Sequence, residues 1–149
     1  MEVLDEDMEA IATLLPKLIW AQQRQMAQDL SGYGLTFPQF IALTVLEQFS
    51  GECRMGPLAS AALQSAASMT GIVDLLLERW LVRRERHPED RRSVVVYLTD
   101  HGRSLLAEVK VNRHQQGRAL LAAIPPGDRQ LLRQVLARMV ELMEKRRAD

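Results

Sequence analysis

The sequence predicts a mainly α-helical protein with one small β-hairpin, an α+β fold, on three observations. Apolar residues recur at helical spacing over most of the 149 residues. One late stretch is instead β-branched and aromatic, which favours a strand. The composition, 47% hydrophobic and 26% charged, is that of an ordinary globular chain, and its length predicts a single domain over residues 1–149.

Cysteine usage and hydropathy narrow the class of protein further. The chain has one cysteine, Cys53, so no intramolecular disulfide can form. No apolar run reaches the roughly 18–20 residues that span a bilayer, and the acidic N-terminal stretch has the wrong charge for a secretory signal peptide. We therefore expect a soluble cytoplasmic protein without a membrane partner.

The formal net charge is zero, but the two halves of the chain carry opposite charge. Residues 1–78 contain 3 basic and 10 acidic residues, net −7, whereas residues 79–149 contain 16 basic and 9 acidic residues, net +7. This distribution predicts one acidic and one basic surface. Solvated helix faces would give the same asymmetry, so the charge alone does not define a partner.

The N-terminal third predicts two helices. Helical spacing of apolar residues marks the first over residues 5–31, and Pro16 inside it allows a kink or a break. Thr36 and Gln39 have capping-box spacing at the start of the second helix. That helix is apolar nearly all round, so it is expected to be buried and to end near Ser50.

The middle of the chain predicts a helix pair with a tight turn. A short helix starts at Gly56 and runs to about Leu63, and Ser65 caps the next helix, which runs from Ala66 to about Trp80. The expected buried stripe of this second helix consists of Met69, Ile72, Val73, Leu76 and Trp80, opposite Ala67, Thr70, Gly71 and Asp74.

The C-terminal half predicts a hairpin and two long helices. Strands are expected over residues 82–86 and 93–98, joined by a polar turn that contains a proline. Thr99 then caps a helix to about Ala123, and a sixth helix follows the break at Pro125.

Short helix, tight turn, helix and charged hairpin is the order of a winged helix-turn-helix, here over residues 35–102. Helices in residues 1–34 and 103–147 are then left for dimerisation. The second helix of such a pair can enter the DNA major groove, and the hairpin can reach the backbone or the minor groove. The hairpin holds a dense cluster of arginines, whose permanent charge and forked donors suit phosphate: Arg83, Arg84, Arg86, Arg91 and Arg92. An α/β module with a charged turn is the alternative.

Several motifs resemble those of the MarR family of bacterial transcriptional regulators. Residues 35–40, LTFPQF, look like the family's LTxxQF, and residues 83–92, RRERHPEDRR, resemble its wing pattern R-x-x-x-P-x-D-x-R. Residues 98–102 follow with LTxxG. The resemblance covers roughly residues 35–143. It implies a homodimeric DNA-binding repressor, often relieved by a small phenolic or other aromatic ligand and sometimes by oxidation or a metal.

The chain departs from this family at the recognition helix. Trp80 stands where the family usually has glycine, and a bulky apolar residue there is expected to be buried or to lie against a neighbour. No lysine or arginine occurs between Arg54 and Arg79, so this helix cannot read guanine through a bidentate arginine. The candidate DNA-binding residues are Ser65, Ala67, Ser68, Thr70 and Gly71 on the helix and Arg84, Arg86, Asp90, Arg91 and Arg92 in the wing.

Within the wing, Asp90 and Arg92 form the D-x-R pair of the resemblance. Because they are two residues apart, their side chains can approach each other on a turn. We expect the Asp90 carboxylate to hold the Arg92 guanidinium in one orientation for entry into the minor groove. The alternative is a surface ion pair that only orders the loop.

No catalytic constellation, metal site or cofactor motif emerges from the remaining residues. His87, His101 and His114 are too scattered for a ligand pair. Cys53 is either a redox sensor or an unreactive thiol, and the second reading is favoured. We therefore expect no enzyme activity and no cofactor.

Two further sites are expected, one where the flanking helices meet the winged region and one on the sixth helix. A pocket for a small aromatic ligand is expected near Trp20, Phe37 and Phe40, although core packing would explain the same residues. The sixth helix carries an apolar stripe too wide for one short core, which predicts a homodimer; it consists of Leu131, Leu132, Val135, Leu136, Met139 and Leu142.

The sequence as a whole predicts a sequence-specific DNA-binding transcriptional regulator, a repressor relieved by a small ligand. The alternative is a winged-helix protein-interaction module with weak or non-specific DNA binding, which the lack of lysine and arginine in the recognition helix motivates. Both readings keep double-stranded DNA as a partner to be tested.

Overall fold

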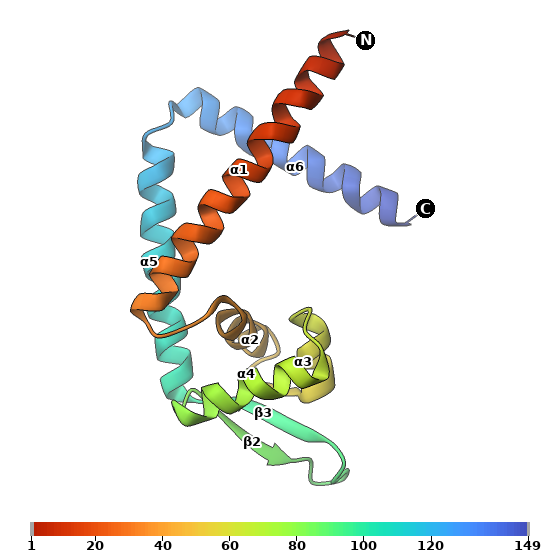
Figure 1. Ribbon diagram of the computed structural model, residues 1–149, viewed down its shortest axis with the longest axis vertical. Coiled ribbons are helices and arrows are strands. Elements are labelled where there is room, and N and C mark those ends of the chain that lie inside the picture. The colour runs from red at the N-terminus through yellow and green to blue at the C-terminus, as the bar shows by residue number, and fades with distance from the viewer. Residues whose placement is uncertain (1, 149) are drawn as a thin grey trace. The chain divides into compact units, whose positions relative to one another are not determined.

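The computed structural model describes residues 2–148, which form helices and one small antiparallel sheet (Figure 1). The chain divides into two compact units, Met1–Val109 and Lys110–Asp149. The predicted α+β class is confirmed. The elements in chain order are α1 (Glu2–Gly32), α2 (Phe37–Gln48), β1 (Glu52–Arg54), α3 (Met55–Ala61), α4 (Ala66–Glu78), β2 (Val82–Arg86), β3 (Val94–Leu98), α5 (Asp100–Ala122) and α6 (Pro126–Ala148).

The sheet has three strands in the order β1-β3-β2, with both pairs antiparallel. Strand β2 pairs with β3 from Val82 opposite Leu98 to Arg86 opposite Val94, as the predicted hairpin requires. Strand β1, which places Cys53 opposite Val96, extends the hairpin into a sheet. Three residues are too few to show an alternating pattern, so only the tertiary pairing reveals this strand.

Helix α2 lies in the core of the first unit, and its N-terminus has the predicted cap. The Thr36 side chain accepts from the Gln39 amide at 3.4 Å, and the Gln39 side chain accepts from the Thr36 amide at 2.9 Å. Leu35 and Phe40, on either side of this cap, are both buried. The core gathers around them from α1, α2, α3, α4, the sheet and α5, with Leu30, Leu43, Leu46, Leu58, Met69, Leu76, Leu81, Val96, Leu106 and Val109 among its members.

Helix α1 is a single helix that passes through Pro16 without a break. Its C-terminal end is anchored, because Leu30 is fully buried in the core and Met26 packs against it. Its upstream apolar residues, expected at helical spacing, are exposed: Met8, Ile11, Leu15, Leu18 and Ile19.

The second unit contains the end of α5 and all of α6. The residues of the predicted α6 stripe, from Leu131 to Leu142, are exposed. Among the described residues no single helix is long and apolar enough to cross a membrane, and only α3 and α4, as a pair bent by 102°, meet the length and composition together.

The end of helix α4 corrects one prediction. Trp80 does not join the buried stripe: its backbone is left-handed, with φ 58°, and its side chain is 80% exposed. The cause is a Schellman cap, in which the Trp80 amide donates to the Leu77 carbonyl and the Leu81 amide to the Leu76 carbonyl, at 3.0 and 3.1 Å. This reversal directs residue 80 outward and buries Leu81 in its place.

Helix α3 ends in the same way, at the turn of the helix pair. It stops at Ala61, two residues before the expected end, and Leu63 adopts φ 54° with its side chain 92% exposed. The amides of Leu63 and Gln64 donate back to the carbonyls of Ser60 and Ala59. Two large apolar side chains therefore occupy left-handed positions that favour glycine.

Candidate nucleic-acid interface

Helix α4 presents its predicted recognition face to solvent. Met69, Ile72, Val73 and Leu76 are buried and fix which side of the helix is turned outward. The Ser65 hydroxyl accepts from the Ser68 amide at 3.1 Å and caps the first turn, as expected. The outward side carries all five predicted residues, which are exposed: Ser65, Ala67, Ser68, Thr70 and Gly71.

Two of the three hydroxyl groups on this face already donate their hydrogens within the protein. Ser68 donates to the Gln64 side-chain oxygen at 2.7 Å, and Thr70 donates to the Ala66 carbonyl at 3.0 Å. Each oxygen keeps lone pairs that can accept. In the major groove, adenine and cytosine offer amino donors that match such acceptors.

The base of the wing is tied to the recognition helix by charge. Arg84 on β2 donates to the Asp74 carboxylate on α4 at 2.8 Å. On the other side of the strand, Arg83 lies 4.0 Å above the Tyr97 ring and forms an ion pair with Glu85. Two of the wing arginines are thus fixed by contacts with neighbouring side chains, and Arg84 faces helix α4.

The loop at the tip of the wing is closed by backbone contacts, and it corrects the expected role of Asp90. Asp90 Oδ1 accepts from the Arg92 backbone amide at 3.1 Å, and no ion pair joins these two side chains within the described part of the chain. The amide two residues on lies in the natural reach of an aspartate in a turn, whereas the long guanidinium does not have to fold back. Arg86 in turn donates to the Arg91 carbonyl at 3.4 Å.

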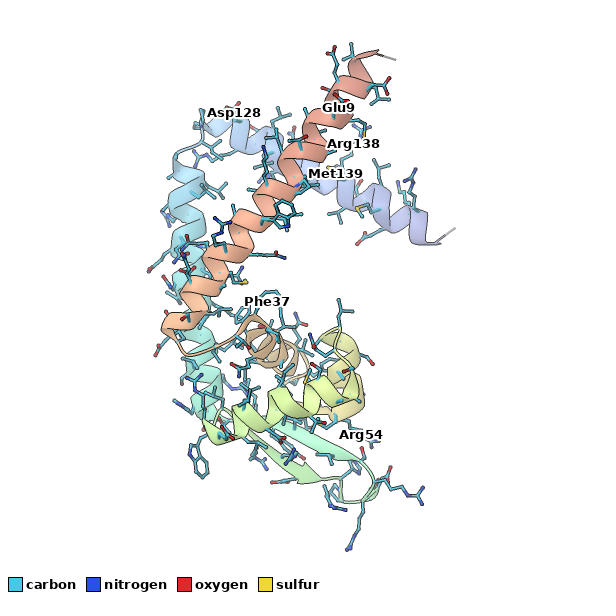
Figure 2. The ribbon with its side chains drawn as sticks, in the orientation of Figure 1. Glu9, Phe37, Arg54, Asp128, Arg138 and Met139 are labelled. Atoms are coloured by element: carbon cyan, nitrogen blue, oxygen red, sulfur yellow. The ribbon has the colours of Figure 1, made fainter. Side chains whose placement is uncertain are left out.

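Arg54 is a basic residue of this region that the sequence did not single out. Because β1 pairs with β3, Arg54 lies beside the wing (Figure 2), and its guanidinium is 3.2 Å from Nε2 of His87. The residues are 33 positions apart, so no local pattern could have joined them. In the sequence, only the position of Arg54 just before the helix pair indicated that it could belong to this surface.

A hollow of about 420 Å³ lies between the recognition helix, the start of α3 and the wing. It brings together Thr70 from the helix with Arg84 and Arg92 from the wing, three residues predicted to bind DNA. Its other lining residues are Met55, Gly56, Ala66, Ser93 and Val94. The remaining predicted wing residues, Arg86, Asp90 and Arg91, lie outside this lining.

The three aromatic residues proposed for a ligand pocket differ in environment. Phe40 is buried in the core of the first unit. Trp20 on α1 and Phe37 at the start of α2 are 65% and 45% exposed, and Figure 2 shows Phe37 at the edge of α2. Phe40 can therefore support such a site only from within the core.

The remaining reactive groups offer little chemistry. Cys53 is buried in strand β1, and desolvation by burial raises the pKa of its thiol, which disfavours the reactive thiolate. Within residues 2–148, no group of three or more His, Cys, Asp or Glu side chains is placed to hold a metal ion.

Comparison with known proteins gives relatives with the same architecture. The model of the MarR family matches residues 33–93. A probable transcriptional regulator from Pseudomonas aeruginosa is 31% identical, with a TM-score of 0.62 over 83% of this chain and 95% of its own. AbsC, a MarR family transcriptional regulator from Streptomyces coelicolor, is 27% identical, with a TM-score of 0.72 over 95% of this chain and 96% of its own. The transcriptional repressor NicR from Pseudomonas putida is 29% identical over 89% of this chain and 84% of its own.

A helix pair with an outward recognition face, followed by an arginine-rich wing, defines a winged helix-turn-helix DNA-binding transcriptional regulator. The motifs, the fold and these relatives agree on its family. The chain belongs to the MarR family, which consists of transcriptional regulators.

Proposed function

We propose that the chain is a homodimeric, sequence-specific repressor that places α4 in the major groove and its wing along the backbone and the minor groove. The observation that carries this proposal is the hollow shared by Thr70, Arg84 and Arg92. It puts a polar, acceptor-rich helix face and permanent cations on one surface. That combination suits base edges and phosphates together.

The division of labour between helix and wing follows from their chemistry. Helix α4 carries no basic residue, so it contributes acceptors and small side chains rather than guanine contacts. The wing carries the cations and therefore supplies most of the affinity, which depends on salt. Sequence preference is expected from amino groups in the major groove and from minor-groove shape.

The test is DNA binding measured at several salt concentrations on fragments selected from genomic DNA. Arg92→Ala should weaken binding and lower the slope of log K against log salt by about one unit. Arg146→Ala, an exposed arginine near the end of α6, is the matched control and should leave binding unchanged. Equal affinity for selected and random fragments would instead favour the winged-helix interaction module.

Dimerisation is supported by the apolar surface that the helices leave uncovered. Large apolar side chains are exposed along α6 and along the upstream part of α1, and exposed apolar surface of this kind marks an interaction site. A second copy of the chain is the proposed partner. Sedimentation at micromolar concentration should show a dimer, and a stable folded monomer would contradict the proposal.

Relief by a small aromatic ligand is proposed at Trp20 and Phe37. Trp20 is largely exposed and Phe37 is about half exposed, and an aromatic ligand with a carboxylate or phenol would gain by stacking on these rings. A panel of aromatic acids should contain a compound that raises the melting temperature and weakens DNA binding. Trp20→Ala should abolish both effects, and a panel without any active compound would remove the support for this site.

A further inference from the structure

Arg79 joins the ends of two helices that are far apart in the sequence. It is the C-cap residue of α4, and its guanidinium donates to the carbonyls of Gly34 and Tyr33 at 2.6 and 2.8 Å. Those carbonyls belong to the turn that directly follows α1. The end of the recognition helix is therefore hydrogen-bonded to the end of α1.

The planar shape of the guanidinium makes this contact specific to arginine. The planar guanidinium fork offers parallel donors to two successive carbonyls, which a lysine cannot do. Helix α1 has no basic residue in its own last turn, and Arg79 places a positive charge next to the turn at the negative end of its dipole.

The backbone at Gly34 is shaped for the approach. Gly34 has φ 66°, in the left-handed region, and a Cβ there would lie 3.3 Å from one nitrogen of the Arg79 guanidinium. Glycine thus permits both the turn that ends α1 and the close position of the arginine. The turn at Gly34 and the Arg79 guanidinium therefore pack closely against each other.

We propose that Arg79 is a positioning residue for DNA binding, which fixes the C-terminal end of α4 to α1 and so sets the orientation of the recognition helix. This inference rests on the proposed use of α4 in the major groove. The predicted contacts Ser65, Ala67 and Ser68 lie at the opposite end of α4 from Arg79.

The length of the helix explains why the anchor matters. At 1.5 Å per residue, the 13-residue helix α4 is roughly 20 Å long. A tilt of about 5° at the anchored end would displace the far end by roughly 2 Å, on this length. Such a displacement is enough to lose hydrogen bonds to base edges.

The first measurement is the distance between the two helices, made without DNA. Spin labels are placed at Gln28→Cys on α1 and Leu75→Cys on α4, both exposed, in a Cys53→Ser background. Labelled chain is diluted with excess unlabelled chain, so that only distances within one chain are counted. Arg79→Ala should broaden the distance distribution, Arg79→Lys should broaden it less, and the neighbouring control Glu78→Ala should leave it unchanged.

The second measurement is affinity for the selected DNA together with the thermal transition of each variant. Arg79→Ala should weaken binding by roughly tenfold, the size expected for losing charge-assisted hydrogen bonds, while it keeps a cooperative melting transition. Arg79→Lys should recover part of the lost DNA affinity. If Arg79→Ala does not fold, the comparison with the wild type is made with Arg79→Lys.

The outcomes separate this inference from the proposed function. An unchanged distance distribution in both Arg79 variants overturns the inference, and so does a broadened distribution with wild-type DNA affinity. If the wild-type chain binds no DNA, the proposed function fails and with it the positioning role, while the distances still report whether Arg79 ties the two helices together.

Discussion

Asp90 and Arg92 are joined at the tip of the wing through a backbone amide and not through their charges. Asp90 Oδ1 accepts from the Arg92 N–H at 3.1 Å, and the Asp90 carbonyl accepts from the Ser93 amide at 2.9 Å. The carboxylate therefore shapes the loop, and the loop sets the direction in which the guanidinium leaves it. The D-x-R spacing has a physical basis that differs from the expected ion pair.

This relationship predicts opposite effects for two neutral replacements of Asp90. Asp90→Asn keeps an oxygen that accepts from the Arg92 amide and removes a negative charge near phosphates, so DNA binding should equal or exceed that of the wild type. Asp90→Ala removes the same charge but also the acceptor, so binding should weaken. Fluorescence anisotropy at one fixed salt concentration measures both, and equal effects would show that only the charge matters.

Trp80→Gly should stabilise the fold. Trp80 holds a left-handed backbone at φ 58° in the cap of α4, and its exposed side chain has little packing to lose. Glycine adopts this conformation without the steric cost, which is about 1–2 kcal/mol for an L-residue. Chemical denaturation should show a higher free energy of unfolding, reduced from the full gain by the greater chain entropy of glycine.

Leu63→Gly is the parallel case at the end of α3 and should change stability in the same direction. If Trp80→Gly instead lowers the free energy of unfolding of the protein, while Leu63→Gly raises it, the Trp80 side chain makes stabilising contacts with another molecule.

Two glycines should respond in opposite ways to alanine. A Cβ at Gly102 would lie 2.1 Å from the Leu81 carbonyl oxygen, so the backbone must move, and Gly102→Ala should cost about 1–3 kcal/mol or more. A Cβ at Gly71 meets nothing within 4 Å, so Gly71→Ala in the middle of α4 should stabilise by roughly 0.5–1 kcal/mol. Thermal and urea unfolding decide both, and a neutral Gly102→Ala would contradict the close approach.

Cys53 should behave as a buried structural thiol. Its burial raises the pKa, so the native protein should react with a thiol reagent near neutral pH far more slowly than the unfolded chain. Since folding raises this pKa, the associated stability is full at neutral pH and is lost as the pH rises above the ordinary thiol range. Rapid labelling of the native state, or loss of DNA binding on mild oxidation that Cys53→Ser prevents, would assign a sensor role instead.

Elements with local signals could be predicted from the order of the amino acids. The capping residues Thr36, Ser65 and Thr99 each occupy the predicted position, and Thr99 accepts from the Gly102 amide at 3.0 Å. The two strands of the hairpin and the outward face of α4 also follow from local sequence patterns. These features depend on residues three or four apart, or on the pattern along one strand. They can therefore be predicted without knowledge of the fold.

Contacts between distant segments could not be predicted in this way and are known from the folded chain. The fold pairs β1 with β3 and places Arg54 beside His87. It also brings Arg84 into contact with Asp74, and Arg79 into contact with the turn after α1. It also turns Trp80 outward, because the Schellman cap that buries Leu81 takes precedence over the hydrophobicity of the indole ring. All of these contacts have the same cause. The local sequence is compatible with many pairings, and packing of the core stabilises these ones.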